Sequence, residues 1–172
     1  VTDDKNVKTT PIMSPSTNID NIESNIPIVV IDEGFSLNEC STIPSSAPIL
    51  YLRPRTICAG IGCKRNMEQQ PIEEALLQTF KEEGLHPLSL KCIATIPLKS
   101  DEPGIIGTAA NLNVPLKIIP TEKIEKLDIS QLGIATSEFV ASQTGVLSVS
   151  TACSYLASGK GEILRDKAKY KG

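Results

Sequence analysis

Apolar residues recur along the chain at two spacings, and these spacings predict which segments are helices and which are strands. Between Pro71 and Gly84 the apolar positions follow a helical repeat, which predicts an amphipathic helix with proline in its first turn and glycine at its carboxyl cap. Short runs of β-branched and other apolar residues predict strands. The predicted strands are 26–31, 49–52, 56–61, 88–96 and 114–119, with a closing strand at 163–164.

Further helices are predicted at 103–112, 121–126, 137–142 and 148–157, and glycines end the last of them. Helices and strands therefore alternate in the later part of the chain, which predicts a three-layer α/β/α domain with a mixed sheet over residues 55–172. Residues 1–54 begin with a segment poor in large apolar groups and include a stretch rich in serine and proline. We expect an extended linker module with one or two strands there.

The composition is that of an ordinary globular protein, and it excludes several classes of function. With 40% hydrophobic residues, 22% charged residues and a net charge of −3, the chain lacks the cationic excess of a general nucleic-acid binder. No apolar run approaches the roughly 20 residues that span a bilayer, and the polar first residues do not resemble a signal peptide. Because the chain does not begin with methionine, we expect further sequence upstream.

The cysteines and the histidine are not spaced as in a zinc site or a nucleophile–base pair. The five cysteines include no CxxC pair, whereas a structural zinc site takes four nitrogen or sulfur ligands that usually arrive in such pairs. We therefore expect no metal site, and free thiols in a reducing cytoplasm. His86 is the only histidine and lies in a predicted helix-to-strand turn, where a solvated side chain is the simplest expectation.

The strongest local motif is the loop that follows the predicted strand 56–61. Gly60 and Gly62 let backbone amides approach a ligand closely, and Lys64 and Arg65 add positive charge, which suits a phosphate or a carboxylate. A dinucleotide-binding loop would have a third glycine near Arg65 and an immediate helix, and a Walker loop would continue with Gly-Lys-Ser/Thr. The sequence has neither, and a tight turn with solvated cations is the alternative from the residues alone.

Two later stretches combine polar residues with predicted helix starts. Lys99 and Glu102 follow a predicted strand, at the edge where ligands of open α/β sheets bind. Lys99 could bind a carboxylate, and Glu102 could act as a general acid or base. The alternative is a solvated helix start capped by Asp101 or Glu102. Thr144 lies before the last predicted helix, and Ser148 stands at its start. Ser148 is most simply the N-cap, at a helix end that also attracts anions. No base lies near Ser148 in the sequence, which argues against a nucleophilic serine.

These stretches together follow the order and spacing of a known family. Over about residues 56–172 the chain resembles the carboxyl-terminal domain shared by the cobalamin-pathway proteins CbiG and CobE. The Gly-Cys-Lys-Arg run at 62–65 is more typical of CbiG, and a segment before the domain also suits the middle linker of CbiG. The matching segments are 59–65, 72–77, 93–94, Lys99 with 101–104, 144–146, 148–149, 152–156 and Lys167.

The resemblance implies a function in the anaerobic pathway of cobalamin biosynthesis. CbiG-like proteins are associated with opening the δ-lactone ring of a cobalt-precorrin and releasing a two-carbon fragment as acetaldehyde. The resemblance makes Glu102 the candidate proton carrier. Cobalt is carried by the substrate, so no cofactor is expected; a homodimer and contacts with other enzymes of the pathway are further expectations. The residues implied to bind the acidic tetrapyrrole are Gly60, Gly62, Cys63, Lys64, Arg65, Lys99, Thr144 and Ser148.

Departures from the family pattern bear on catalysis. Ser150 and Thr151 stand where family members often carry an acidic residue, and neither the family's last apolar strand nor the amino-terminal CbiG domain is part of this sequence. The sequence therefore leaves two main alternatives, a hydrolase or its substrate-holding part, and a non-catalytic carrier like CobE. They differ in whether a carboxylate with a shifted pKa lies beside the basic residues. A nucleotide-phosphate-binding domain is a third alternative, against which the absent third glycine argues.

Overall fold

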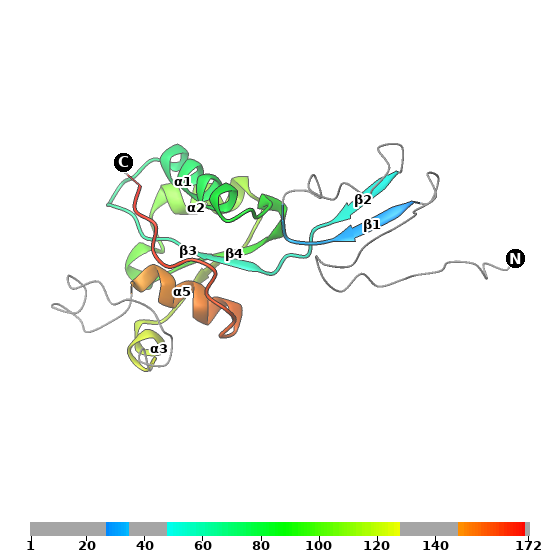
Figure 1. Cartoon of the computed structure of the whole chain (residues 1–172). Helices are drawn as coiled ribbons and strands as arrows, with labels where there is room; N and C mark the ends of the chain where they lie inside the picture. Colours follow the sequence, from blue (N-terminus) through cyan, green and yellow to red (C-terminus); the bar gives the residue numbers. More distant parts are fainter. Residues whose placement is uncertain (1–26, 35–47, 128–147, 171–172) are drawn as a thin grey trace, which may run out of the picture. The chain divides into compact units, whose positions relative to one another are not determined.

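The computed structural model describes residues 27–34, 48–127 and 148–170 (Figure 1). These residues fall into two compact units, 27–30 with 48–51 and 31–34 with 52–127 and 148–170. The predicted helix 137–142, Thr144 and most of the predicted linker lie outside the described residues. No helix within the described ranges is long and apolar enough to cross a membrane.

A two-stranded sheet of β1 (Ile28–Ile31) and β2 (Ile49–Leu52), most of which belongs to the smaller unit, confirms the two strands predicted there. Ile28 N donates to Pro48 O at 2.9 Å, and Asp32 N donates to Leu52 O at 3.2 Å. Because donor and acceptor advance by the same number of residues, the hydrogen bonds follow the parallel pattern.

The larger unit is built on a parallel sheet in the order β3 (Ile57–Gly60), β4 (Leu90–Thr95) and β5 (Leu116–Ile118). The central strand β4 is buried at every position except Lys91, as expected for a parallel strand covered on both faces. The sequence predicted a mixed sheet, whereas both described ladders of this sheet are parallel. Within the described residues, antiparallel pairing occurs at an isolated bridge between Gly34 and Leu85.

Helices cover both faces of this sheet, which confirms the α/β class and the three predicted layers (Figure 1). One face carries α1 (Gln69–Glu82) and α2 (Pro103–Asn111), and the other carries α3 (Thr121–Glu125) and α5 (Val149–Ser158). Cys92, Ile93 and Ala94 of β4 point alternately to opposite faces, and β4 therefore supplies both cores. The core under α1 and α2 contains Ile72, Leu76, Phe80, Leu90, Ile93, Ile105 and Ala109. The core under α3 and α5 contains Cys92, Ala94, Ile119, Ile124, Ala152, Cys153 and Ala157.

The predicted strand 88–96 begins two residues late, at Leu90. The reason is a 3-10 turn, η1 (Pro87–Ser89), in which Leu88 N donates to His86 Nδ1 at 3.1 Å. A second 3-10 turn, η2 (Pro97–Lys99), follows β4. These turns account for the difference between the predicted and the observed length of β4.

The closing strand predicted at 163–164 is wrong, because the structure assigns no strand there. Side chains fix this part of the chain instead of a ladder. Arg165 Nη1 lies 2.7 Å from Glu82 Oε2 and 2.8 Å from Glu83 Oε1, and Thr151 Oγ1 donates to Asp166 Oδ1 at 2.8 Å. Two apolar residues beside charged neighbours are too short a run to specify a strand.

Candidate functional site

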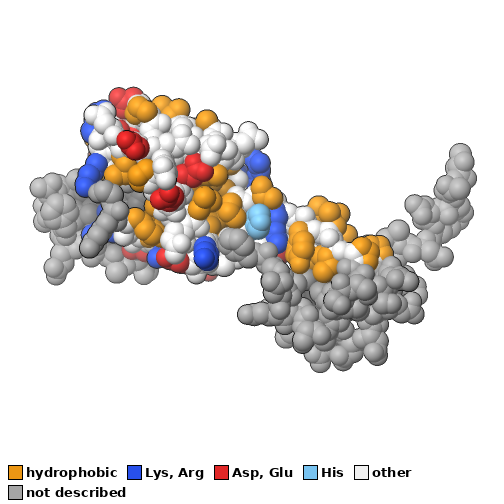
Figure 2. Space-filling view, turned by 90° about the horizontal axis from the view of Figure 1, so that it is seen from above, with side chains coloured by type: hydrophobic (Ala, Val, Ile, Leu, Met, Phe, Trp, Pro, Cys, Tyr) orange, Lys and Arg blue, Asp and Glu red, His pale blue; other side chains and the backbone are white. Residues whose placement is uncertain are grey.

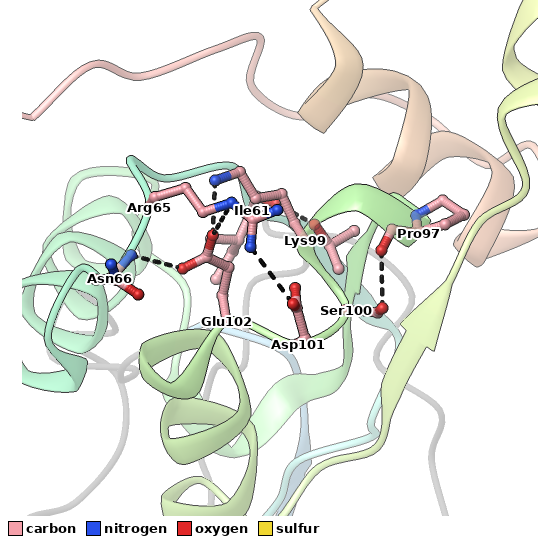
Figure 3. Close-up of polar contacts among 9 residues, drawn as sticks. Ile61, Arg65, Asn66, Pro97, Lys99, Ser100, Asp101 and Glu102 are labelled. Atoms are coloured by element: carbon pink, nitrogen blue, oxygen red, sulfur yellow. Dashed lines mark hydrogen bonds and ion pairs between the residues drawn. The ribbon is translucent and has the colours of Figure 1, made fainter.

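Three of the predicted stretches meet at the carboxyl ends of β3 and β4. Ile61, the first residue after β3, donates its N–H to Ala94 O at 2.9 Å and accepts a bond from Thr95 Oγ1 at 2.8 Å. These bonds fix the start of the glycine-rich loop on the neighbouring strand. The loop then reaches the segment after β4 through contacts of Arg65 and Asn66 (Figure 3).

Gly60, the last residue of β3, packs against the first turn of α5. A methyl group at its Cβ position would overlap the carbonyl oxygen of Ser150 and lie 3.1 Å from Ser154 N. Close packing of the strand against the helix backbone therefore explains this glycine without any ligand. The same contact places the amino end of α5 beside the loop, where the hydroxyls of Ser148 and Ser150 lie 2.8 Å apart.

Gly62 is a glycine of a different kind. It is exposed, its φ is not among the positive values, and no atom outside its immediate neighbours lies within 4 Å of the position of a Cβ. Neither packing nor backbone conformation therefore requires glycine at this position. The backbone at Gly62 is therefore open to close approach by a ligand.

Glu102 is the buried charge of the site and is only 1% exposed (Figure 3). Lys99 Nζ donates to its Oε1 at 2.8 Å, Asn66 N donates to its Oε2 at 2.9 Å, and Arg65 Nε lies 3.7 Å from Oε1. The hydrogen bond from Lys99, supported by the bond from Asn66 and the charge of Arg65, lowers the pKa of Glu102 against the opposing effect of burial. Glu102 is therefore ionised at neutral pH, where it accepts bonds and does not donate a proton.

Arg65 extends from the loop toward the surface. Its Nη1 lies 3.4 Å from Asp101 Oδ2, and the two side chains are 59% and 68% exposed. The next residue, Asn66, has a φ of 56°, a left-handed conformation that asparagine tolerates better than most residues. This turn directs the Asn66 N–H to Glu102 while Arg65 stays at the surface.

The other predicted binding residues are arranged less uniformly. Lys64 is exposed on the loop, whereas Cys63 packs against the core under α1 and α2, and burial raises the pKa of its thiol. A protonated, core-facing thiol is a poor nucleophile and a poor ligand. Ser148 holds the N-cap position of α5 as predicted, but its side chain makes no capping hydrogen bond. Thr144 lies outside the described residues.

Sequence reasoning missed two parts of this site. Asn66 in a loop before a helix is a turn signal, and that signal could have suggested its left-handed conformation. The role of Asp101 as the partner of Arg65 depends on the tertiary fold and has no sequence signal. In the ranges that the structure describes, no group of three or more His, Cys, Asp or Glu side chains is placed to hold a metal ion.

The surroundings of the site contain a shallow hollow and a mixed surface charge. The hollow, of about 380 Å³, lies beside the loop between the amino ends of α1 and α2 and is lined by residues 66–69, Pro103 and Gly104. Over the larger unit, the face seen in Figure 2 intersperses cations and anions among apolar side chains. This face does not carry the continuous basic surface of a general nucleic-acid binder.

Comparisons with known proteins agree in one assignment. Residues 57–172 match the family described as cobalamin synthesis G C-terminus. The cobalt-precorrin-5A hydrolase of Salmonella typhimurium is 32% identical over 135 residues, which are 78% of this chain and 37% of that protein. The cobalt-precorrin-5A hydrolase of Priestia megaterium is 30% identical over 111 residues, 64% of this chain and 28% of that protein. The chain thus spans about a third of the length of these hydrolases.

The same comparisons include the shorter protein CobE. Protein CobE of Sinorhizobium sp is 24% identical over 105 residues, 61% of this chain and 67% of that protein. A solved structure of CobE, a protein of the cobalamin biosynthetic pathway, superimposes with a TM-score of 0.58 and 28% identity. It covers 68% of this chain and 84% of the CobE chain, which supports the fold described above.

Proposed function

Because this chain belongs to the cobalamin synthesis G C-terminus family, we propose that its larger unit holds an acidic cobalt-corrin intermediate of cobalamin biosynthesis. The binding surface is the loop at the carboxyl ends of β3 and β4. In this proposal the chain is the substrate-holding part of a hydrolase of the cobalt-precorrin-5A type, the activity for which two of its relatives are named. The reaction it serves is the opening of the δ-lactone with loss of acetaldehyde.

The observation that carries this proposal is the unobstructed surface of Gly62 next to the exposed cations Lys64 and Arg65. A corrin precursor presents several carboxylates at its edge, and carboxylates form their strongest hydrogen bonds with cationic donors. The loop is fixed at Ile61 by backbone and side-chain bonds and at Asn66 by Glu102. Its cations are therefore presented on a fixed backbone, which reduces the entropy lost on binding.

Holding the substrate, rather than transforming it, is what the ionisation states at this loop support. The lowered pKa of Glu102 makes it an ion-paired carboxylate, and the raised pKa of Cys63 keeps its thiol protonated. His86 lies before the amino end of β4, whereas the loop lies at the carboxyl ends of β3 and β4. A non-catalytic carrier is the second candidate, because CobE, a protein of the cobalamin pathway, consists mostly of the part shared with this chain, which covers 84% of it. Both candidates require carboxylate binding at the same loop.

The experiment that tests the proposal is an absorbance-monitored titration of the chain with a cobalt-corrin lactone precursor, followed by an assay for acetaldehyde. We expect saturable binding without release of acetaldehyde. Release would place the lactone-opening groups inside these 172 residues and make Glu102 the first residue to substitute. Absence of binding would refute the proposal. Membership of the family would then indicate common ancestry without a shared binding function. A cytoplasmic location, a homodimer and contacts with other enzymes of the pathway stay predictions.

A further inference from the structure

The two cations that contact Glu102 are held in different ways. Lys99 Nζ lies 2.8 Å from Glu102 Oε1, and the Lys99 side chain is only 16% exposed. Arg65 Nε lies 3.7 Å from the same oxygen, and Arg65 Nη1 lies 3.4 Å from Asp101 Oδ2. Charge-assisted N–H···O bonds are normally about 2.7–2.9 Å long. Lys99 thus makes a short bond, whereas both contacts of Arg65 are long.

The exposure of Arg65 and Asp101 makes their contact easy to break. Both side chains are more than half exposed, and a single long contact joins one nitrogen to one oxygen. Ion pairs of this kind contribute little, because water screens the attraction and two side chains lose rotamer freedom to maintain it. A carboxylate arriving from a ligand would meet an arginine whose present partner is easily displaced.

Releasing Arg65 would leave the buried carboxylate satisfied. Lys99 donates to Glu102 Oε1, and Asn66 N donates to Oε2 at 2.9 Å, so each oxygen keeps a short bond without Arg65. Breaking a buried ion pair is costly mainly because it leaves an uncompensated charge, and that cost does not arise here. The movement of Arg65 is therefore compatible with an unchanged loop.

We propose that Arg65 captures a ligand carboxylate and that Asp101 is an internal competitor, which occupies Arg65 until that carboxylate replaces it. This inference rests on the proposed function and deepens it, because it names the residue that binds a ligand carboxylate and the residue that competes with that carboxylate. One carboxylate replaces another at the guanidinium, so no proton moves. Lys99 and Glu102 are positioning residues that hold the loop, and they do not contact the ligand. Because Asp101 must be displaced, a ligand with several carboxylates is favoured over a simple monocarboxylate.

The test is a titration with uroporphyrin, a tetrapyrrole polycarboxylate, followed by its absorbance. Wild type, Asp101→Asn, Arg65→Gln, the double variant and Glu162→Gln are compared, after circular dichroism has confirmed that each is folded. Glu162 is exposed beyond the carboxyl end of α5, so its substitution gives the same change of net charge away from the loop. We expect Asp101→Asn to tighten binding about two- to five-fold, the range of an exposed ion pair. Arg65→Gln weakens binding, and Glu162→Gln leaves it near wild type.

The double variant distinguishes competition for Arg65 from a general charge effect. In the Arg65→Gln background the further change Asp101→Asn should have no effect, because the competitor has nothing left to occupy. Unchanged or weaker binding by Asp101→Asn, or an equal gain in Glu162→Gln, overturns the inference. Equally tight binding of uroporphyrin methyl ester also overturns it, because the ester lacks the carboxylates.

Failure of this inference is separable from failure of the proposed function. If wild type binds the cobalt-corrin lactone precursor and uroporphyrin, but all four variants bind like wild type, the roles of Arg65 and Asp101 are refuted while the substrate-holding function stands. If wild type binds neither tetrapyrrole, the proposed function is refuted, and this inference is refuted with it.

Discussion

Substituting alanine for Gly60 should destabilise the fold, whereas the same change two residues later should not. At Gly60 the added methyl group would overlap Ser150 O, lie 2.6 Å from Ser150 C and lie 3.1 Å from Ser154 N. Carbon atoms in favourable contact are about 3.5–4.0 Å apart, and Ser150 O is closer still to the added methyl group, so strand and helix would have to separate by more than about 1 Å. The obstructing atoms belong to the backbone of α5, which cannot rotate away as a flexible side chain would.

The expected cost follows from the packing of α5. Overpacking of a core typically costs about 1–3 kcal/mol, and we expect the upper end of this range because the clash is with backbone. For a chain of this size that corresponds to a fall in Tm of roughly 10 °C. At Gly62 the Cβ position has no neighbour within 4 Å, so we expect alanine there to change the free energy of unfolding by no more than about 0.5 kcal/mol.

Urea denaturation followed by far-ultraviolet circular dichroism measures both effects, since the chain has no tryptophan to serve as a fluorescent probe. Gly62→Ala is the matched control, with the same chemical change two residues further along the chain. Equal stabilities for the two variants would refute the structural role assigned to Gly60. A loss at Gly62 as large as that at Gly60 would refute the claim that Gly62 is unconstrained by packing.

The remaining predictions concern charge and burial. Replacing Lys64 and Arg65 together by alanine should weaken binding of the cobalt-corrin precursor by roughly 1–3 kcal/mol per lost charge-assisted bond in the absorbance titration; unchanged binding would return the loop to a structural turn. The pKa of Glu102 is lowered in the fold, so its contribution to stability is present above the unfolded-state pKa and is lost as pH falls through the folded-state value. Glu102→Gln should therefore flatten the fall in unfolding free energy below about pH 4, and an equally steep fall in this variant would contradict the assignment. Burial raises the pKa values of Cys92 and Cys153 to about 11, so a thiol reagent at pH 8 should label both only on unfolding; rapid labelling of the native chain would show that they are accessible.

The layered fold could be predicted because its signals are local and repeated. The helical repeat between Pro71 and Gly84 predicted α1, and the observed helix begins only two residues earlier, at Gln69. The glycine after the last predicted helix does end it, since Gly159 has a φ of 86°. The predicted strand 163–164 failed because an apolar pair carries no period, and contacts with α1 and α5 decide its conformation.

The sequence predicts which segments form the candidate site, but not what each residue does there. Strand–loop–helix order places the stretches after β3 and β4 at one edge of a parallel sheet, and the structure does bring them together. The roles depend on burial, which the sequence around Glu102 does not reveal. Glu102 looks like a solvated residue at a helix start, yet it is among the largest fully buried side chains, paired with Lys99. The assignment of the two glycines likewise depends on where α5 packs.

The charge arrangement also bears on how the site would contribute to catalysis in a complete hydrolase. Lys64 and Arg65 lie on a loop that is fixed before any ligand arrives, and the peripheral carboxylates of a corrin do not change charge when the lactone opens. Interactions that are equally strong in the ground state and the transition state lower KM without raising kcat. Substituting these cations should accordingly change KM alone, whereas substituting a residue that transfers the proton would change kcat. Glu102 is ionised and already bonded at both oxygens, and its lowered pKa moves away from the neutral pH at which a proton carrier would have to work. This is the physical reason for placing it among the positioning residues.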